Sequence, residues 1–246
     1  MKKLFALLIA AMMILSAFAA LAENGTLTMC TNAAFPPYEF YDEDGNATGI
    51  DVEIAKAIGA KLGYDIEIVD IEFAQCIPGV QSGKYDFSAA GMTVTEERKQ
   101  MVQFTDTYAT GIQSIIVKED STIASVDDLK AAGIKIGVQQ DTTGDIYATD
   151  DFGEDHMARF NKGADAVMAL STGKVNAVII DNSPAETFVA QNPGLKILPT
   201  AYAEEAYGFE ISYDKEEFYN AFNGALEELL KDGTIQGIID KYIKAE

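Results

Sequence analysis

The sequence predicts an α/β fold in which mostly parallel sheets are flanked by helices on both faces. Two observations carry this prediction. Short strand-like runs are followed by stretches with apolar residues at helical spacing, and this order repeats along most of the chain. The longest predicted helix, from 215 to 230, also has one apolar face, as a helix packed on a core does. That face consists of Phe218, Phe222, Leu226 and Leu229.

The first block of elements runs from residue 26 to about 108. Residues 26–31 alternate polar and apolar side chains, as a strand does. Asp51 is a suitable N-cap for a helix that continues to Lys61, and Gly63 is a suitable stop. The other elements predicted in this block are strands at 64–69 and 85–90 and helices at 75–82 and 96–102.

A second block repeats the order, and the chain then returns with a late strand and two helices. Ser125 and Asp128 form a capping pattern at the start of a short helix. Predicted strands lie at 111–117, 134–138, 175–180, 196–198 and 207–213. Predicted helices lie at 125–129, 144–148, 164–171, 184–191, 215–230 and 235–243.

Residues 1–22 have the layout of a secretory signal peptide. Lys2 and Lys3 precede an apolar run, and a small-x-small pattern ends at Ala22. The apolar run is nearly long enough to span a bilayer, so an uncleaved membrane anchor is the alternative. We expect cleavage after Ala22 and therefore a periplasmic or extracellular location.

The composition is strongly acidic, which limits the partners that the protein can bind. Removal of residues 1–22 would leave 224 residues and change the net charge from −21 to −23, because the segment carries two lysines and no acid. Such acidity argues against nucleic acid as a partner, since nucleic-acid binding needs positive patches. It is typical of an exported protein that stays dispersed, and we expect a monomer.

Metal, cofactor or nucleophile chemistry has no support in the residue pattern. His156 is the only histidine, and it lies in an acidic run where we expect it to be exposed. Cys30 and Cys76 lie in apolar stretches, so two buried free thiols are favoured over a disulfide. We therefore expect no metal site, no cofactor and no enzymatic activity.

The stretch Gly91-Met92-Thr93-Val94-Thr95-Glu96-Glu97-Arg98 is the most informative in the chain. It combines a glycine, hydroxyl side chains and an arginine directly after a predicted strand. Such a turn offers donors to a small anion, and a guanidinium pairs with a carboxylate through two parallel hydrogen bonds. The stretch therefore predicts a site for a molecule that carries a carboxylate.

Three stretches together resemble the periplasmic amino-acid-binding proteins of ABC importers, the solute-binding family 3. The resemblance spans residues 24–246. It is carried by Ala34-Phe35-Pro36-Pro37-Tyr38-Glu39-Phe40 with Gly49-Ile50-Asp51-Val52-Glu53-Ile54-Ala55, by Ile77-Pro78-Gly79-Val80-Gln81-Ser82-Gly83-Lys84-Tyr85-Asp86, and by the Gly91–Arg98 stretch with Phe104-Thr105-Asp106-Thr107-Tyr108.

The resemblance implies a two-lobed periplasmic-binding-protein clamshell. Each lobe would be a mostly parallel sheet flanked by helices, and two hinge crossovers would join the lobes. The implied division is lobe 1 at 23–108, lobe 2 at 109–202 and a return segment of lobe 1 at 203–246.

The resemblance also implies roles for individual residues. Arg98 would bind the ligand α-carboxylate, helped by Thr93 and the backbone at Gly91. Asp181 would bind the α-ammonium group, and it follows a predicted strand, where ligands of α/β sheets bind. The alternative for Asp181 is an N-cap of the next helix.

Five further residues complete the expected site. Thr143 would be a second carboxylate contact, because Thr142, Thr143 and Gly144 precede a helix; a plain capping loop is the alternative. Asp141 stands where the family usually has glycine. The rings that would enclose the ligand side chain are Phe35 and Phe73, and its polar contacts would be Asn32 and Gln139.

The expected function is capture of a free L-amino acid and delivery to the membrane subunits of an ABC transporter. Asn32 is neutral where the family often has aspartate, which favours a neutral polar amino acid over a cationic one. Two alternatives stay open: an exported dehydratase of the cyclohexadienyl or arogenate type on the same fold, and a ligand-sensing module for a membrane receptor.

Overall fold

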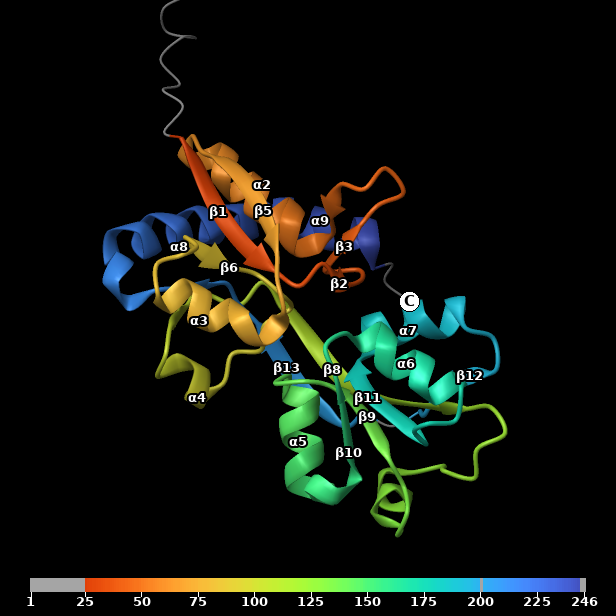
Figure 1. Cartoon of the computed structure of the whole chain (residues 1–246). Helices are drawn as coiled ribbons and strands as arrows, with labels where there is room; N and C mark the ends of the chain where they lie inside the picture. The colour runs from red at the N-terminus through yellow and green to blue at the C-terminus, as the bar shows by residue number, and fades with distance from the viewer. Residues whose placement is uncertain (1–24, 200, 244–246) are drawn as a thin grey trace, which may run out of the picture.

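The computed structural model describes residues 25–199 and 201–243. It has two lobes, each built on a sheet with helices on its faces, and two paired strands run between them (Figure 1). The predicted signal peptide and its cleavage point lie outside the described residues. None of the helices in the described ranges is long and apolar enough to cross a membrane.

The first sheet combines segments from both ends of the chain, in the order β5-β1-β6-β14-β7. Strands β5, β1 and β6 are parallel, whereas β14 is antiparallel to both β6 and β7. The strands are β1 (Thr26–Thr31), β5 (Asp65–Asp70), β6 (Phe87–Ser88), β7 (Gln103–Phe104) and β14 (Glu210–Ile211). Because β14 follows the second lobe in sequence, the first lobe is discontinuous.

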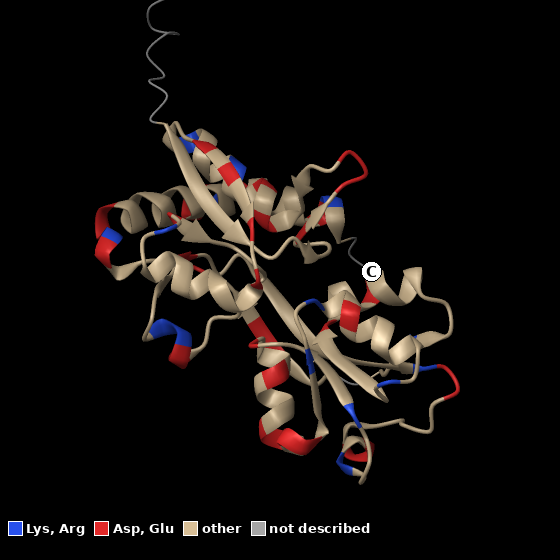
Figure 2. Cartoon of the chain, viewed as in Figure 1, with Lys and Arg blue, Asp and Glu red and all other residues tan. Residues whose placement is uncertain are grey.

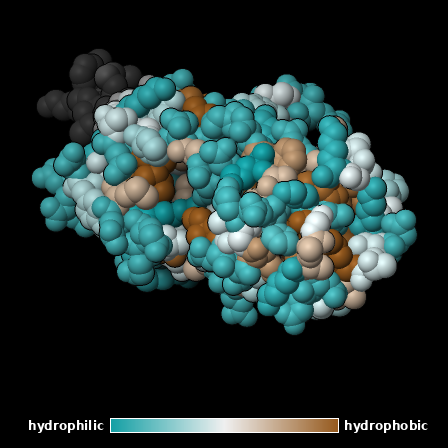
Figure 3. Space-filling model, turned by 60° about the horizontal axis from the view of Figure 1, so that its bottom comes forward, coloured by the Kyte–Doolittle hydropathy of each residue, from teal (hydrophilic) through white to brown (hydrophobic). Residues whose placement is uncertain are grey.

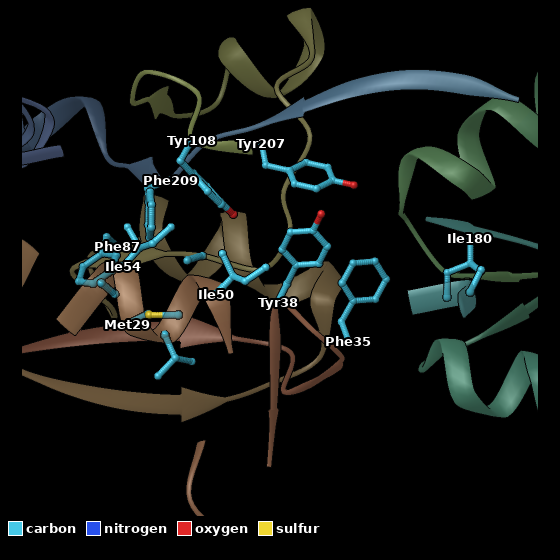
Figure 4. Packing of buried hydrophobic residues seen from close by; sticks show 14 of the residues in the cluster. Met29, Phe35, Tyr38, Ile50, Ile54, Phe87, Tyr108, Ile180, Tyr207 and Phe209 are labelled. Carbon is cyan, nitrogen blue, oxygen red and sulfur yellow. The ribbon is translucent and has the colours of Figure 1, made fainter. Parts of the chain in front are cut away.

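The helices of the first lobe lie where the sequence pattern predicts them, but two details are wrong. Asp51 is not the N-cap of its helix, because the helix begins at Ile50 after Gly49, and the helix predicted at 96–102 ends at Lys99. Helix α2 ends where Gly63 adopts a left-handed conformation, the usual end of a helix. The helices are α2 (Ile50–Leu62), η1 (Phe73–Gln75), α3 (Cys76–Gln81), α4 (Glu96–Lys99), η4 (Tyr213–Lys215), α8 (Glu216–Lys231) and α9 (Thr234–Tyr242). The apolar face of α8 contributes to the core, where the ring of Phe222 lies 4.8 Å from Phe87 and 5.4 Å from Phe209. Figure 4 shows Phe87 and Phe209 in this cluster.

The second sheet has the order β10-β9-β11-β8-β12, and β13 also pairs with β8. Strands β10, β9 and β11 are parallel, but β8 is antiparallel to β11, β12 and β13. This sheet is therefore mixed rather than mostly parallel. Its strands are β8 (Ala109–Lys118), β9 (Ile136–Gln139), β10 (Met157–Phe160), β11 (Ala177–Asp181), β12 (Leu195–Ile197) and β13 (Ala203–Tyr207). Its helices are η2 (Val126–Lys130), α5 (Thr143–Phe152), η3 (Glu154–His156), α6 (Gly163–Ser171) and α7 (Asn182–Gln191).

Strands β8 and β13 connect the lobes. They pair in antiparallel fashion from Ala109 opposite Tyr207 to Gln113 opposite Ala203. The single strand predicted at 207–213 is wrong, because β13 belongs to the second sheet and β14 to the first, with Gly208 and Phe209 between them. The predicted lobe boundaries stay a prediction.

The pattern gave no signal for a small hairpin sheet in the first lobe. This sheet consists of β2 (Ala34–Phe35), β3 (Glu39–Tyr41) and β4 (Ala47–Thr48). Strands of two or three residues are too short for periodicity to reveal them.

The two cysteines, Cys30 and Cys76, are both buried and form no disulfide. His156, the last residue of η3, is half-buried rather than exposed. Acidic residues are spread over both lobes (Figure 2), and the face in Figure 3 is mainly hydrophilic with small separate hydrophobic patches.

Candidate ligand-binding site

A cavity lies between the two lobes, with about 310 Å³ of empty space that includes open solvent. All nine of the expected site residues line it. They are Asn32, Phe35, Phe73, Gly91, Thr93, Arg98, Gln139, Thr143 and Asp181. The structure adds Glu39, Ala90 and Thr142 to the lining.

Arg98 is held in place by backbone carbonyls of both lobes. Its side chain donates from Nη1 to the Thr93 carbonyl at 2.9 Å and from Nη2 to the Asp141 carbonyl at 3.1 Å. The guanidinium also lies 5.6 Å from the centre of the Phe73 ring. Only 5% of Arg98 is exposed, and this burial lowers its pKa. A guanidinium has five N–H donors and stays charged in proteins, so an oriented cation with further donors faces the cavity.

The helix α5 presents its N-terminus to the same cavity. Thr142 is the N-cap, and its hydroxyl accepts from the Asp145 amide at 3.3 Å and donates to the Gln139 carbonyl at 2.8 Å. The hydroxyls of Thr143 and Thr93 meet across the lobes at 3.3 Å. A helix N-terminus carries partial positive charge, so this corner suits the same anion as Arg98.

Asp141 adopts a left-handed conformation in the loop before α5, with φ of 63°. This backbone explains why glycine suits the position, because side chains rarely tolerate a positive φ. Even with aspartate in place of glycine, the loop reaches the site, because the Asp141 carbonyl accepts a hydrogen bond from Arg98.

The expected role of the Gly91 amide needs correction. This N–H donates to Asp51 Oδ2 at 2.8 Å, so it is not available to a ligand carboxylate. Gly91 has φ of 53°, and a Cβ atom here would lie 3.0 Å from the Phe35 ring. The glycine is therefore required by the backbone and by the ring beside it.

Asp181 lies at the carboxyl end of β11, on the opposite lobe from Arg98. It occupies the N-cap position of α7, but its side chain makes no capping hydrogen bond. Instead Tyr207 donates its hydroxyl hydrogen to Asp181 Oδ1. Burial, followed by the nearby Glu205 carboxylate, raises the pKa of Asp181 to about 8. A cation bound beside Asp181 would favour its ionised form.

The two amide side chains of the site bind each other across the lobes. Gln139 donates to Asn32 Oδ1 at 3.0 Å, and Asn32 donates to the Ile71 carbonyl at 2.7 Å. Gln139 also donates to the Asn161 carbonyl at 3.2 Å. Both side chains are buried, so this end of the cavity offers neutral donors and acceptors.

The aromatic walls come from the first lobe. The Phe35 ring stacks on Tyr38 with 5.9 Å between ring centres, and Tyr38 in turn meets the edge of Tyr207 at 5.2 Å. Figure 4 shows these three rings next to one another. Phe73, from η1, lies on the Arg98 side of the cavity.

Glu39 is the charged residue among the three lining residues that the structure adds. Its side chain reaches the cavity because β2 and β3 pair Glu39 with Phe35, so both lie on one face of the hairpin. The sequence offers no sign of this pairing beyond the turn-forming prolines at 36 and 37. No group of three or more His, Cys, Asp or Glu in the described residues is arranged to hold a metal ion.

Comparison with known proteins gives a consistent result. The family "Bacterial extracellular solute-binding proteins, family 3" matches residues 27–245. The arginine-binding extracellular protein ArtP of Bacillus subtilis (strain 168) is 35% identical over 258 residues, which covers 100% of each chain.

Solved structures agree with this assignment. An ancestral arginine-binding protein bound to glutamine superposes with a TM-score of 0.85 at 40% identity, covering 90% of this chain and 99% of that one. An ancestral amino-acid-binding protein described as a precursor of cyclohexadienyl dehydratase gives a TM-score of 0.83 at 33% identity, covering 93% and 100%. Matches of this extent, together with the interlobe cavity, identify the chain as a member of the bacterial extracellular solute-binding proteins of family 3.

Proposed function

We propose that this protein captures a free L-amino acid between its lobes and delivers it to the membrane subunits of an ABC transporter. One observation carries the proposal: Arg98 of the first lobe and Asp181 of the second line one cavity. A zwitterion has a carboxylate and an ammonium group on the same carbon, so these two side chains would bind both of its charges.

Because these groups lie on opposite lobes, a bound ligand would favour the closed arrangement of the lobes. Arg98, Thr93 and Thr143 would bind the carboxylate, and Asp181 the ammonium, so a ligand contacts both lobes only when they are closed. To shift the lobes from mostly open to mostly closed requires about 5.5 kcal/mol of differential binding. Hydrogen bonds to charged groups contribute about 1.5–3 kcal/mol each, so a few such contacts suffice.

The neutral end of the cavity supports a neutral polar side chain on the ligand. Asn32 and Gln139 can exchange their mutual hydrogen bond for bonds to an amide or hydroxyl. A cationic side chain would find no carboxylate on either of these residues. The relatives include an arginine-binding protein and an ancestral one bound to glutamine, so both ligand classes belong in the test.

Isothermal titration of the purified protein with the twenty amino acids, cystine and ornithine tests the proposal. We expect the tightest binding for a neutral polar amino acid such as glutamine. A tighter complex with arginine or lysine would overturn the side-chain preference while leaving the amino-acid function intact. Absence of binding to every amino acid would overturn the function itself.

Two variants test the roles of the charged pair. Arg98→Ala should abolish binding, because the carboxylate would lose its cationic partner. Asp181→Asn should weaken binding of the amino acid far more than of its analogue without the α-amino group. Lys130→Ala, in an exposed ion pair of the second lobe with Asp127, is a matched control and should bind as wild type does.

Location and partners follow the same proposal. We propose that residues 1–22 direct export, that cleavage after Ala22 releases the protein, and that it acts as a monomer with an ABC transporter. The mass of the exported protein, measured by mass spectrometry, tests the cleavage point. Light scattering tests the oligomeric state.

A dehydratase is the second candidate, favoured by the match to a precursor of cyclohexadienyl dehydratase. Such an enzyme would need an acid group facing its substrate, and the cavity contains a carboxyl group apart from Asp181, that of Glu39. Turnover of prephenate or arogenate by the purified protein, without affinity for amino acids, would establish this alternative.

A further inference from the structure

Glu39 has an oxygen atom that no protein group satisfies. The residue is 1% exposed and begins β3. Within the described part of the chain, its Oε2 atom has no hydrogen-bond partner, and its side chain lines the interlobe cavity. A buried acceptor without a partner is unfavourable, and such groups in native proteins often have a functional reason.

The neighbour of Glu39 is Asp51, a second buried carboxyl group. Asp51 accepts from the Gly91 amide at 2.8 Å on Oδ2 and from the Tyr108 hydroxyl at 2.6 Å on Oδ1. The Glu39 and Asp51 side chains also hydrogen-bond to each other. Two carboxyl groups in such contact hold a proton between them, because two adjacent buried negative charges repel.

The surroundings assign the shared proton to Glu39. Asp51 receives two hydrogen bonds that favour its charged form, and its pKa is raised only to about 6 by burial. Burial and the adjacent Asp51 charge raise the pKa of Glu39 well above its ordinary value. Of the two groups, Glu39 therefore holds the shared proton more strongly, and a protonated carboxyl group keeps one carbonyl-type oxygen as an acceptor.

A chain of contacts connects Glu39 with Asp181, the residue that would bind the ligand ammonium group. Its cross-strand partner Phe35 stacks on Tyr38, and Tyr38 contacts the Tyr207 ring, whose hydroxyl binds Asp181. The Asp181 charge also acts on the Glu39 carboxyl group across the cavity. Figure 4 shows Phe35, Tyr38 and Tyr207 side by side, with Ile180 of the opposite lobe facing them.

We propose that Glu39 is a second recognition group for the ligand α-ammonium, in which its neutral carboxyl group accepts one N–H while Asp181 binds another from the opposite lobe. This inference rests on the proposed function and deepens it. Together the two groups would accept two of the three N–H donors of the ammonium, and the neutral one would add no negative charge. The Glu39 carboxyl group would therefore add no charge to those of Asp181 and the buried Asp51.

Two substitutions and a ligand pair test the proposal, using the tightest-binding amino acid and its analogue without the α-amino group. Glu39→Gln keeps both a donor toward Asp51 and an acceptor toward the cavity, so we expect affinity within about threefold of wild type. Glu39→Leu removes the acceptor and should weaken amino-acid binding about tenfold or more. Binding of the analogue should change less than threefold.

Each of the other possible results contradicts one part of the proposal. Unchanged amino-acid affinity of Glu39→Leu, or equal losses for both ligands, would show that Glu39 only supports the fold. A loss in Glu39→Gln as large as in Glu39→Leu would show that Glu39 does not act as a neutral acceptor. A wild-type protein that binds no amino acid would overturn the proposed function, and this inference with it.

Proton counting keeps the proposal testable if Glu39→Leu does not fold. Titrations in two buffers of different ionisation enthalpy give the number of protons released on binding. Because the Glu39 proton stays in place, wild type and Glu39→Gln should release the same number. A difference of about one proton would overturn the proposal.

Discussion

The Tyr207 hydroxyl, on the returning strand β13, donates a hydrogen bond to the Asp181 carboxylate at the end of β11. Strand β8 lies between these two strands in the sheet, and the absence of a side chain at Gly111 makes the contact possible. A Cβ atom on Gly111 would lie 1.8 Å from the Tyr207 hydroxyl oxygen. Tyr207 also bridges to Thr93 of the first lobe. Tyr207, which ends one of the two strands that connect the lobes, thus contacts residues on both sides of the candidate site.

Tyr207→Phe should weaken amino-acid binding about fivefold to twentyfold at pH 7. The hydroxyl lowers the pKa of Asp181, so its loss would raise that pKa above about 8 and make ionisation of Asp181 for the ligand ammonium more costly. Titration calorimetry from pH 6 to 9 measures this effect. The deficit should shrink as the pH rises, and a deficit independent of pH would contradict the mechanism.

Gly111→Ala should reduce both binding and stability. The added methyl group overlaps Tyr207 and comes within 3.0 Å of Asp181 Oδ1, so the ring must move out of a packed site. Overpacking of this kind costs about 1–3 kcal/mol. Urea denaturation and ligand titration measure the two effects. Gly224→Ala is a suitable control, because a Cβ atom there meets no atom within 4 Å.

Stability of the protein without ligand should decrease as the pH rises from about 4 to 8. Folding raises the pKa of Asp51 to about 6 and of Asp181 to about 8, from an ordinary value of 3.8. The folded state then holds more protons than the unfolded state, so the free energy of unfolding is highest below the ordinary pKa and falls as these groups ionise. Urea titrations at several pH values check the direction. In Asp181→Asn, the decrease between pH 6 and 8 should be smaller.

Asp141→Gly should stabilise the protein by about 1 kcal/mol. Asp141 has φ of 63°, a conformation that costs a residue with a side chain roughly this much. The carbonyl that accepts from Arg98 is backbone, so ligand affinity should stay within twofold. Urea denaturation measures the gain, and Asp141→Ala should show none of it. An unchanged or lower midpoint in Asp141→Gly would show that the loop carries no strain.

The sequence predicted the helices and long strands well, because amphipathic spacing in α2 and α8 and apolar runs in β9 and β11 leave a direct periodic signal. It placed Arg98 and Asp181 in one site only through the resemblance to a family, since 83 residues separate them and no local pattern links them. Glu39 and Tyr207 were missed for a related reason. Their roles depend on hairpin register and on a neighbouring glycine, and neither leaves a trace in composition or spacing.

The paired crossovers limit how the two lobes can move. Five residue pairs join β8 and β13. Sliding one strand along the other would break these backbone hydrogen bonds, whereas bending the ribbon out of its plane keeps them. Bending of the ribbon is therefore the deformation that this pairing opposes least. Relative motion of the lobes would follow this bend and not a slide of one lobe past the other.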